Sequence, residues 1–307
     1  MLELLASRGV NAEMLSTLPG GRTIGAVRDA LDAGTFDVVI AMGGDGTFRE
    51  VASALLASRA PERTALGMMP TGTANDQGKS FGLEASPHAL ERNVDVICAA
   101  NEARLDAGVL RAGGATDHFF DSAGWGLSAR VLARRNQDRR FVEALGPLKE
   151  LYRDHAVYAG ALLKTFLESY VINDKFSVTG TLDGVPFELD GITDLVVKNT
   201  RIYGGAWVFD KTSEPDDGAF ELVPFRGKRD WTSKAIVDLD GNPLTEAILN
   251  EIGVEHSKPV RASVMEIEIQ EPAGGALLAA QLDGEEWPAH GSVRIEVIPR
   301  AIRLIVP

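Results

Sequence analysis

The chain has 307 residues, of which 45% are hydrophobic and 24% are charged, a composition typical of a globular protein with one large or two moderate domains. Its formal net charge of −13 argues against non-specific binding to nucleic acid and against general attraction to anionic lipid. The single cysteine, Cys98, excludes an intramolecular disulfide and suits a reducing cytoplasm, and the sequence leads us to expect neither a membrane-spanning helix nor a signal peptide.

The first hundred residues alternate between helical and strand patterns. We expect helices at residues 22–33 and 47–58 and from Ser86-Pro87 to about residue 100, and strands at residues 36–42 and 65–69. This alternation implies a parallel sheet covered by helices, in which a nucleotide binds at the carboxyl ends of the strands.

Short strands dominate after about Arg104. The expected strands are residues 104–111, 117–122, 176–182, 185–197, 219–225, 262–270, 276–282 and 292–306. Residues 264–270 alternate apolar and polar side chains, as an antiparallel strand with one solvated face should. A leucine-rich helical block at about residues 141–170 interrupts the strands. The sequence therefore predicts an α/β domain over residues 1–105 and a mainly β domain over residues 106–300.

Two small-residue loops follow neighbouring strands of the predicted sheet. Gly43-Gly44-Asp45-Gly46-Thr47 follows the first strand, and Pro70-Thr71-Gly72-Thr73-Ala74-Asn75-Asp76 follows the second. Glycines let backbone N–H groups approach a phosphate, a helix N-terminus adds partial positive charge, and the aspartates suit Mg²⁺. Ordinary strand-to-helix turns are the alternative interpretation, but two such loops in an α/β pattern make it the weaker one.

These two motifs resemble the catalytic domain shared by diacylglycerol kinases, sphingosine kinases and bacterial soluble lipid kinases. The first motif also occurs in NAD kinases, so the second motif is the one that distinguishes the lipid kinases from them. The resemblance extends from about Thr17 to the C-terminus. It implies an N-terminal three-layer α/β nucleotide-binding domain, then a β-sandwich that binds the lipid, with a final strand at residues 301–307 that returns to the first domain.

The resemblance also implies the residues that contact ATP and Mg²⁺. The nucleotide contacts would be Thr17, Gly44, Asp45, Gly46, Thr47, Glu50, Gly72, Thr73 and Asn75. Asp45, Asp76 and Asp106 would form a catalytic Mg²⁺ network, partly through water, because Mg²⁺ needs only one or two direct carboxylates.

Two acidic turns in the second domain carry further expectations from the resemblance. Asp283 would be the base that accepts the lipid hydroxyl proton, supported by Glu285, although Asp283-Gly284 alone is most simply a hairpin turn. The turn at residues 214–219 would hold a structural Mg²⁺ through the Asp217 side chain and the backbone carbonyls of Glu214 and Ala219, with a plain β-turn as the alternative.

Some segments depart from the family pattern. Asp121 and Arg49 stand where asparagine is usual. Family members begin with a strand that ends in an N-P-x-x-G phosphate loop, whereas residues 2–10 already match the following helix, so we expect this strand and loop to be absent from the chain. An arginine cluster at residues 130–140 indicates peripheral contact with a membrane surface, or else a solvated helix face.

The sequence thus predicts a cytoplasmic lipid kinase that phosphorylates the hydroxyl of a diacylglycerol-like or related lipid at the membrane surface. It uses ATP and Mg²⁺, binds no nucleic acid, and leaves room for a homodimer. The alternatives are a NAD kinase-like enzyme and a non-catalytic lipid- or nucleotide-binding relative. The motif at residues 70–76 weighs against the first, because a dinucleotide substrate needs a different second loop.

Overall fold

The computed structural model describes residues 1–72, 74–130, 132–133, 175–203, 207–208, 213–227, 230, 258–270 and 278–307. Thr73, the arginines at residues 134–140 and the expected helical block at residues 141–170 lie outside these ranges. In the part of the chain that is described, no helix is both long enough and apolar enough to cross a membrane.

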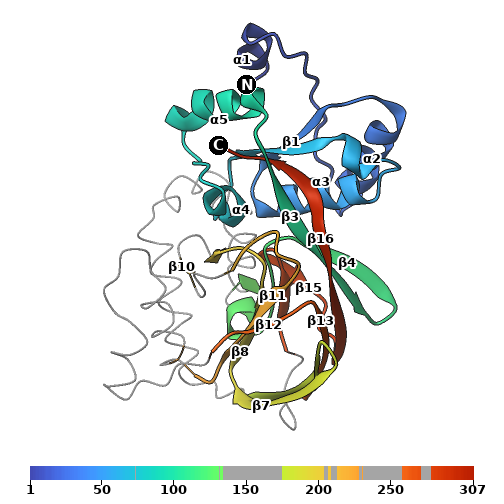
Figure 1. Ribbon diagram of the computed structural model, residues 1–307, viewed down its shortest axis with the longest axis vertical. Coiled ribbons are helices and arrows are strands. Elements are labelled where there is room, and N and C mark those ends of the chain that lie inside the picture. Colours follow the sequence, from blue (N-terminus) through green and yellow to red (C-terminus); the bar gives the residue numbers. More distant parts are fainter. Residues whose placement is uncertain are drawn as a thin grey trace, which may run out of the picture.

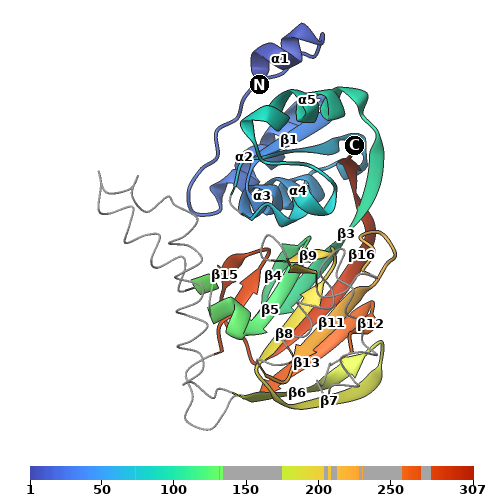
Figure 2. The same cartoon turned by 90° about the vertical axis from the view of Figure 1, so that its left-hand side faces the viewer.

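The N-terminal half forms three layers (Figures 1 and 2). Its helices are α1 (Leu2–Ser7), α2 (Arg22–Ala33), α3 (Asp45–Leu56), α4 (Asp76–Ser80) and α5 (Leu90–Ala99), with 3-10 turns at Pro61–Arg63 and Pro87–Ala89. Strands β1 (Val38–Gly43) and β2 (Ala65–Pro70) run parallel. Leu66 and Met68 of β2 pack with α2 and α3, whereas Ala65 and Met69 pack with α5 and α1. This alternation gives the central sheet a helical layer on each face.

The second half is built from antiparallel strands. They are β3 (Glu102–Ala112), β4 (Ala115–Phe119), β5 (Ser122–Gly126), β6 (Phe176–Leu182), β7 (Val185–Ile192), β8 (Asp194–Lys198), β9 (Ile202–Tyr203), β10 (Trp207–Val208), β11 (Phe220–Phe225), β12 (Val260–Ala262), β13 (Val264–Gln270), β14 (Ala280–Leu282), β15 (Glu285–Trp287) and β16 (Ser292–Ile305). Within the described ranges, six strands pair in the order β12-β11-β8-β5-β14-β15. A larger sheet has the order β1-β2-β16-β13-β6-β7, with β3 on β16 and β4 on β3.

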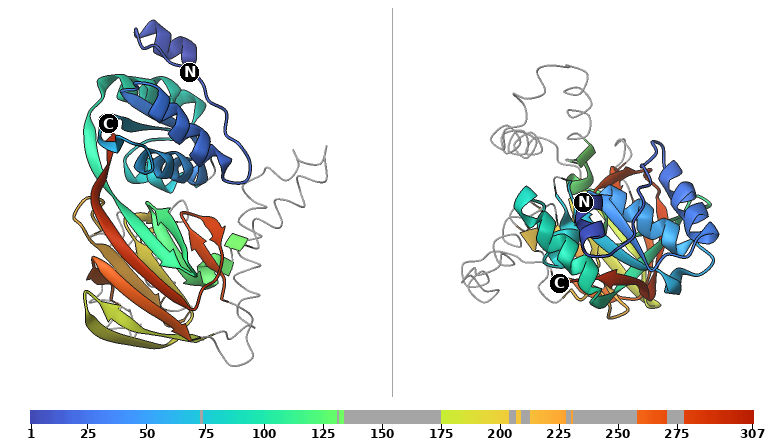
Figure 3. Two further views of the ribbon diagram at one scale, coloured as in Figure 1. Left: turned by 90° about the vertical axis from the view of Figure 1, so that its right-hand side faces the viewer. Right: turned by 90° about the horizontal axis from the view of Figure 1, so that it is seen from above.

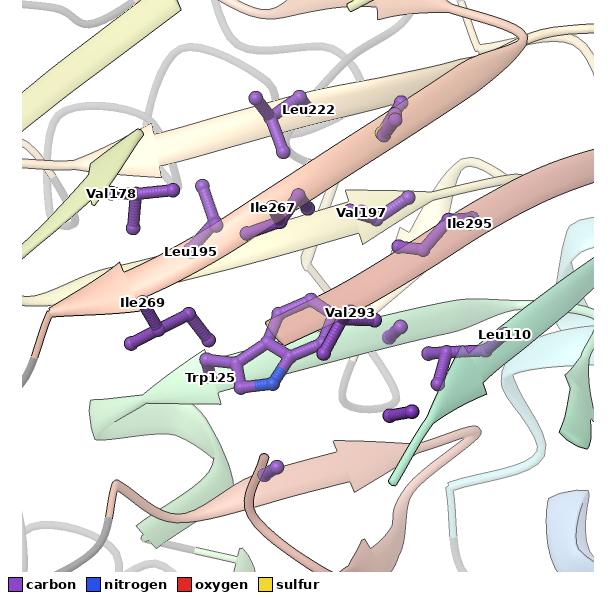
Figure 4. Close-up of a cluster of buried hydrophobic side chains, with 14 of the residues drawn as sticks. Leu110, Trp125, Val178, Leu195, Val197, Leu222, Ile267, Ile269, Val293 and Ile295 are labelled. Carbon is purple, nitrogen blue, oxygen red and sulfur yellow. The ribbon is translucent and has the colours of Figure 1, made fainter. Parts of the chain in front are cut away.

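A hydrophobic core fills the space between the two β layers (Figure 4). Trp125 and Leu195 come from the six-stranded sheet, and Ile267 and Val293 come from the larger one. Each of the four is at most 2% exposed. The expected fold class, an α/β domain followed by a β-sandwich, is confirmed.

Three predicted strands are each two strands in the structure, which corrects the sequence interpretation. Residues 117–122, 185–197 and 262–270 are divided between β4 and β5, β7 and β8, and β12 and β13. In each pair the chain crosses from one sheet to the other. At the second crossing Gly191 has φ 63°, which favours glycine, and it lies where the register of β7 with β6 shifts between Leu189 and Ile192. Apolar periodicity continues through such a crossing, because both sheets face the same core.

Strands β3 and β16 run through both halves of the molecule (Figures 1 and 3). β16 pairs with β13 near its start and with β3 over most of its length, and its Leu304 lies beside Leu66 of β2. An irregularity between Ile298 and Ile302 bends the strand, and Arg300 there has φ 53°. The C-terminal strand therefore extends the sheet of the α/β half.

Candidate active site

The two glycine loops lie against each other at the carboxyl ends of β1 and β2. A Cβ atom added to Gly44 would lie 3.2 Å from the Gly72 Cα atom. The Thr71 N–H donates to the Gly43 carbonyl at 2.9 Å. Asn75 closes the second loop, because its Oδ1 accepts from the Gly72 N–H at 2.8 Å and its Nδ2 donates to the Gly72 carbonyl at 2.7 Å. Only glycine fits where two backbones approach this closely.

Asp45 lies at the first position of α3 and links the two loops. Gly44 is the N-cap and offers no side chain, so the amides at this helix end keep their capacity to bind an anion. The Asp45 Oδ1 accepts from the Gln77 N–H at 3.2 Å, and neighbouring Asp76 starts α4 and is only 8% exposed. Burial, and next the negative charge of Asp121, raise the pKa of Asp45 to about 6.

Asp283 is both a turn residue and a buried carboxylate. It joins β14 to β15 with Gly284, and both residues have positive φ, 47° and 79°, as the predicted hairpin turn requires. Its carboxylate accepts hydrogen bonds from three consecutive backbone N–H groups, those of Phe120 at 2.9 Å, Asp121 at 2.7 Å and Ser122 at 3.0 Å. We call these three groups the amide cradle.

The electrostatics of Asp283 combine opposing effects. Burial raises the pKa of its carboxyl, the guanidinium of Arg49 lowers it, the charge of Asp121 raises it and the amide cradle lowers it, and the net pKa is about 7. Oδ1 receives bonds from all three amides, whereas Oδ2 receives only the one from Phe120. Oδ2 is therefore the carboxylate oxygen with fewer hydrogen-bond partners.

Glu285 connects this hairpin to the first glycine loop. A Cβ atom on Gly46 would lie 2.9 Å from the Glu285 Oε1, so the Glu285 side chain packs directly against the first glycine loop. Glu285 itself is exposed. The structure thus brings Asp45, Gly46 and the Asp283-Gly284-Glu285 turn to one place, although they are far apart in the sequence.

The other expected nucleotide contacts are placed less tightly. Thr47 and Glu50 lie half-buried on α3, with the Thr47 side chain packed over Gly43. Gly72 is exposed, and Thr17 lies exposed in the irregular segment between α1 and α2. Their contact with a nucleotide stays a prediction.

Asp106 belongs to the other acidic turn rather than to the glycine loops. Its Oδ1 accepts from the Arg300 N–H at 2.5 Å and its Oδ2 from the Gly218 N–H at 2.7 Å. Its own N–H donates to the Pro215 carbonyl at 2.7 Å. Burial raises the pKa of Asp106, and the acidic neighbours that raise it further are Asp217 and Asp216. Its membership of a magnesium network with Asp45 and Asp76 stays a prediction that these contacts do not support.

The structure suits a metal ion better at the glycine loops than at the turn of residues 214–219. Asp45 and Asp76 suit a magnesium ion, since the two carboxylates stand at the starts of helices α3 and α4 and carboxylate oxygens are ligands that Mg²⁺ prefers. Across the described ranges no group of three or more His, Cys, Asp or Glu side chains could hold a metal, but Mg²⁺ needs fewer protein ligands than that.

The fit at residues 214–219 is poorer. The Asp217 Oδ1 accepts from the Ala219 N–H at 3.1 Å, and its Oδ2 forms an ion pair with Arg261. Glu214 is also exposed and faces Arg201 at 3.9 Å. The carboxylate expected to bind Mg²⁺ is therefore already neutralised by a cation of the protein itself.

Sequence reasoning missed a buried ion pair beside the amide cradle. The Lys198 Nζ lies 3.1 Å from the Asp121 Oδ1, and the two side chains are 1% and 3% exposed. The signal was present, since Lys198 ends an apolar strand and Asp121 follows two phenylalanines. A charged residue inside an apolar run needs a partner, but the sequence does not show which one.

Comparisons with known proteins agree with this geometry. Residues 1–110 match the family described as Diacylglycerol kinase catalytic domain. Over these residues the chain resembles the diacylglycerol kinase catalytic domain. A relative in Pseudomonas aeruginosa strain UCBPP-PA14, named probable lipid kinase YegS-like, is 29% identical over 283 residues, which cover 92% of this chain and 80% of the relative.

Two further matches extend over nearly the whole chain. A probable lipid kinase YegS-like of Enterobacter sp. strain 638 is 27% identical over 305 residues, covering 99% of this chain and 89% of the relative. The solved structure of a putative diacylglycerol kinase from Bacillus anthracis strain Sterne is similar in fold, with a TM-score of 0.69 at 21% identity and coverage of 100% of this chain and 90% of that one. The expected resemblance to the diacylglycerol kinase-type lipid kinases is confirmed.

Proposed function

We propose that this protein transfers the γ-phosphoryl group of ATP to the hydroxyl group of a diacylglycerol-like or related lipid. The observation that carries the proposal is the contact between Glu285 and Gly46, which sets the Asp283 hairpin against the first glycine loop. Phosphoryl transfer needs held phosphates, neutralised charge and a group that takes the hydroxyl proton. Groups suited to each of these tasks meet here.

The glycine loops suit the phosphates of ATP. The uncapped start of α3 presents backbone N–H groups, and Gly44 and Gly72 let the two loops lie against each other beside that helix end. Asp45 and Asp76 would hold Mg²⁺, which when bound neutralises phosphate charge. Glu50 lies on the same helix as the first loop and keeps the nucleotide-binding role that the family resemblance gives it.

Asp283 is the proposed proton acceptor. The lipid hydroxyl oxygen forms a bond to the γ-phosphorus, the bond from that phosphorus to the β,γ-bridging oxygen breaks, and ADP leaves with the bond electrons. The hydroxyl proton passes to the Asp283 Oδ2, the carboxylate oxygen less occupied by the amide cradle. A pKa near 7 suits a base that works at neutral pH.

Purified protein incubated with labelled ATP, Mg²⁺ and a panel of lipid alcohols in mixed micelles tests this function. Transfer of label to one lipid is the expected result, and it should be lost in Asp45→Ala. Label that moves to NAD instead would show a NAD kinase-like enzyme. Nucleotide binding without transfer to any acceptor would show a non-catalytic relative. The proposal also includes a cytoplasmic location with access to a membrane surface, which cell fractionation would check.

A further inference from the structure

A fully buried salt bridge lies behind the amide cradle. The Lys198 Nζ contacts the Asp121 Oδ1 at 3.1 Å, donates to the Ile202 carbonyl at 2.7 Å and lies 5.2 Å from the centre of the Tyr203 ring. Removing two charges from water costs free energy, and an apolar pair of similar volume would often be as stable. The general need for a core therefore does not explain this pair.

Asp121 is bonded through every polar atom that it has. Its Oδ1 also accepts from the Thr200 hydroxyl, and its Oδ2 accepts from the Ser122 hydroxyl at 3.0 Å. Its backbone N–H is the central member of the amide cradle, and its carbonyl accepts from the Asn199 N–H at 2.8 Å. The side chain of Asp121 thus fixes the very peptide that holds Asp283.

Thr200 carries this network across to the second glycine loop. The Ser80 Oγ, at the end of α4, donates to the Thr200 Oγ1 at 3.3 Å and accepts from the Ile202 N–H at 3.3 Å. α4 begins at Asp76, directly after that loop. A continuous path of hydrogen bonds therefore runs from α4 through Thr200 and Asp121 to Asp283.

We propose that Thr200, Asp121 and Lys198 form a positioning network that fixes the Asp283 carboxylate relative to the second glycine loop. None of the three is assigned contact with a substrate. Asp121 stands where the family pattern usually has asparagine, and a buried carboxylate there needs the cation that Lys198 supplies. The catalytic part of this inference rests on the proposed function, and its structural part does not.

Thr200→Val tests the network because it keeps the side-chain shape and removes the hydroxyl. We expect kcat for lipid phosphorylation to fall by about tenfold or more with a smaller change in the KM for ATP, because displaced reacting groups slow the chemical step. Thr200→Ser, which keeps the hydroxyl, should restore most of kcat. Thr181→Val is the matched control, since the hydroxyl of Thr181 bonds the exposed Glu266 on the far sheet and, among the described residues, no member of the network.

Hydrogen exchange supplies a readout independent of activity. Thr200→Val should speed the exchange of the amides of residues 120–122 and 76–80 and leave residues 264–270 unchanged, as a local loosening would. If Thr200→Val speeds this exchange but the parent protein phosphorylates no lipid, the proposed function is refuted and the network stands. Parent-like kcat and exchange in Thr200→Val would overturn the network.

A charge-removal set covers the case in which Thr200→Val does not fold. Lys198→Met and Asp121→Asn each leave a buried charge or donor unpaired, so both should lower the melting temperature and kcat. The double variant removes both charges and keeps an acceptor for the Thr200 hydroxyl. Its melting temperature and kcat should therefore return much of the way to the parent values. Losses that simply add in the double variant would contradict a coupled network.

Discussion

Asp283 combines a structural role in the hairpin turn with a buried carboxylate suited to be a base, although these were alternative interpretations of the sequence. It forms the hairpin turn with Gly284, and its side chain also binds the amide cradle at residues 120–122. Because those amides belong to the connection from β4 to β5 and to the first residue of β5, the turn ties the hairpin of β14 and β15 to the crossing between the two sheets. Replacing Asp283 must therefore affect stability as well as proton transfer.

Asp283→Asn separates these roles when activity and stability are measured together. The amide NH₂ group cannot accept hydrogen bonds, so part of the amide cradle loses its partner and the free energy of unfolding should fall by about 1–3 kcal/mol. Measured well below the melting temperature, kcat should fall by roughly 10²-fold or more if Asp283 is the base. Glu285→Gln is the comparison, because Glu285 is exposed and should cost little stability. Full activity in Asp283→Asn would return the residue to a purely structural role.

The raised pKa of Asp283 predicts opposite pH effects on activity and stability. A base must be deprotonated, so kcat should rise with pH through a midpoint near 7. The pKa of Asp283 is higher in the folded protein than in the unfolded chain. Between these two pKa values the folded protein therefore holds a proton that the unfolded chain has lost. The stabilisation from this group is therefore fully present below the unfolded pKa and is lost as pH rises through about 7. A kcat that stays constant from about pH 5 to 9 would contradict the assignment.

The residues that the sequence could not place are those whose partners are remote. Asp45 stands in a short motif whose residue types predict its chemistry, whereas the role expected for Asp283 came from the family resemblance. Lys198 and Asp121 are 77 positions apart, and only the pairing of β5 with β8 makes them neighbours. A buried charge predicts that a partner exists, and the strand order decides which one it is.

The contact between the two glycine loops makes their spacing sensitive to a single methyl group. A Cβ atom on Gly72 would overlap the Gly44 Cα and lie 3.1 Å from the Gly44 N. Gly72→Ala should therefore separate the loops and raise the KM for ATP by about tenfold or more, with a lower melting temperature. Gly25→Ala in α2 is the control, because no atom lies within 4 Å of its added Cβ. The KM for ATP should not change in Gly25→Ala, and helix propensity should raise its stability by about 0.5–1 kcal/mol.

Helices and parallel strands were easier to predict than antiparallel ones. α2 spans the expected residues 22–33, and β2 spans Ala65–Pro70 against an expected 65–69. The divided strands escaped detection because a crossing such as that at Ser263 needs no break in apolar pattern. There the Asp183 carboxylate accepts from the Ser263 N–H at 3.1 Å, a contact between residues 80 positions apart.

Asp106 joins the two halves of the molecule where β3 and β16 pass between them. Its two oxygens accept the N–H groups of Gly218 and of Arg300 at the irregularity in β16. Asparagine can satisfy only one of these donors, so Asp106→Asn should lower the free energy of unfolding by about 1–3 kcal/mol. Asp216→Asn in the same turn should change it by less than about 0.5 kcal/mol, because its ion pair with Arg300 is exposed.

Calorimetry checks this role of the shared strands. Since β3 and β16 contribute to both halves, the parent should unfold in one cooperative transition. Asp106→Asn should shift that transition to lower temperature more than Asp216→Asn does. Two well-separated transitions in the parent would contradict the view that the shared strands make the halves one cooperative unit.

The turn at residues 214–219 decides whether the protein carries a structural cation in addition to the one expected at Asp45. Arg261 now pairs with Asp217 and lies 3.5 Å from the buried Glu221, so it competes with Mg²⁺ for the same negative charge. Arg261→Met should therefore increase the rise in melting temperature that Mg²⁺ produces, because it frees an Asp217 oxygen. Asp217→Ala should remove the part of this Mg²⁺-induced rise in melting temperature that comes from the turn. The part that remains comes from Mg²⁺ at the glycine loops, and Asp45→Ala measures it separately. If Arg261→Met responds to Mg²⁺ no more than the parent does, the turn binds no metal, and the Arg261 guanidinium is its permanent counter-ion.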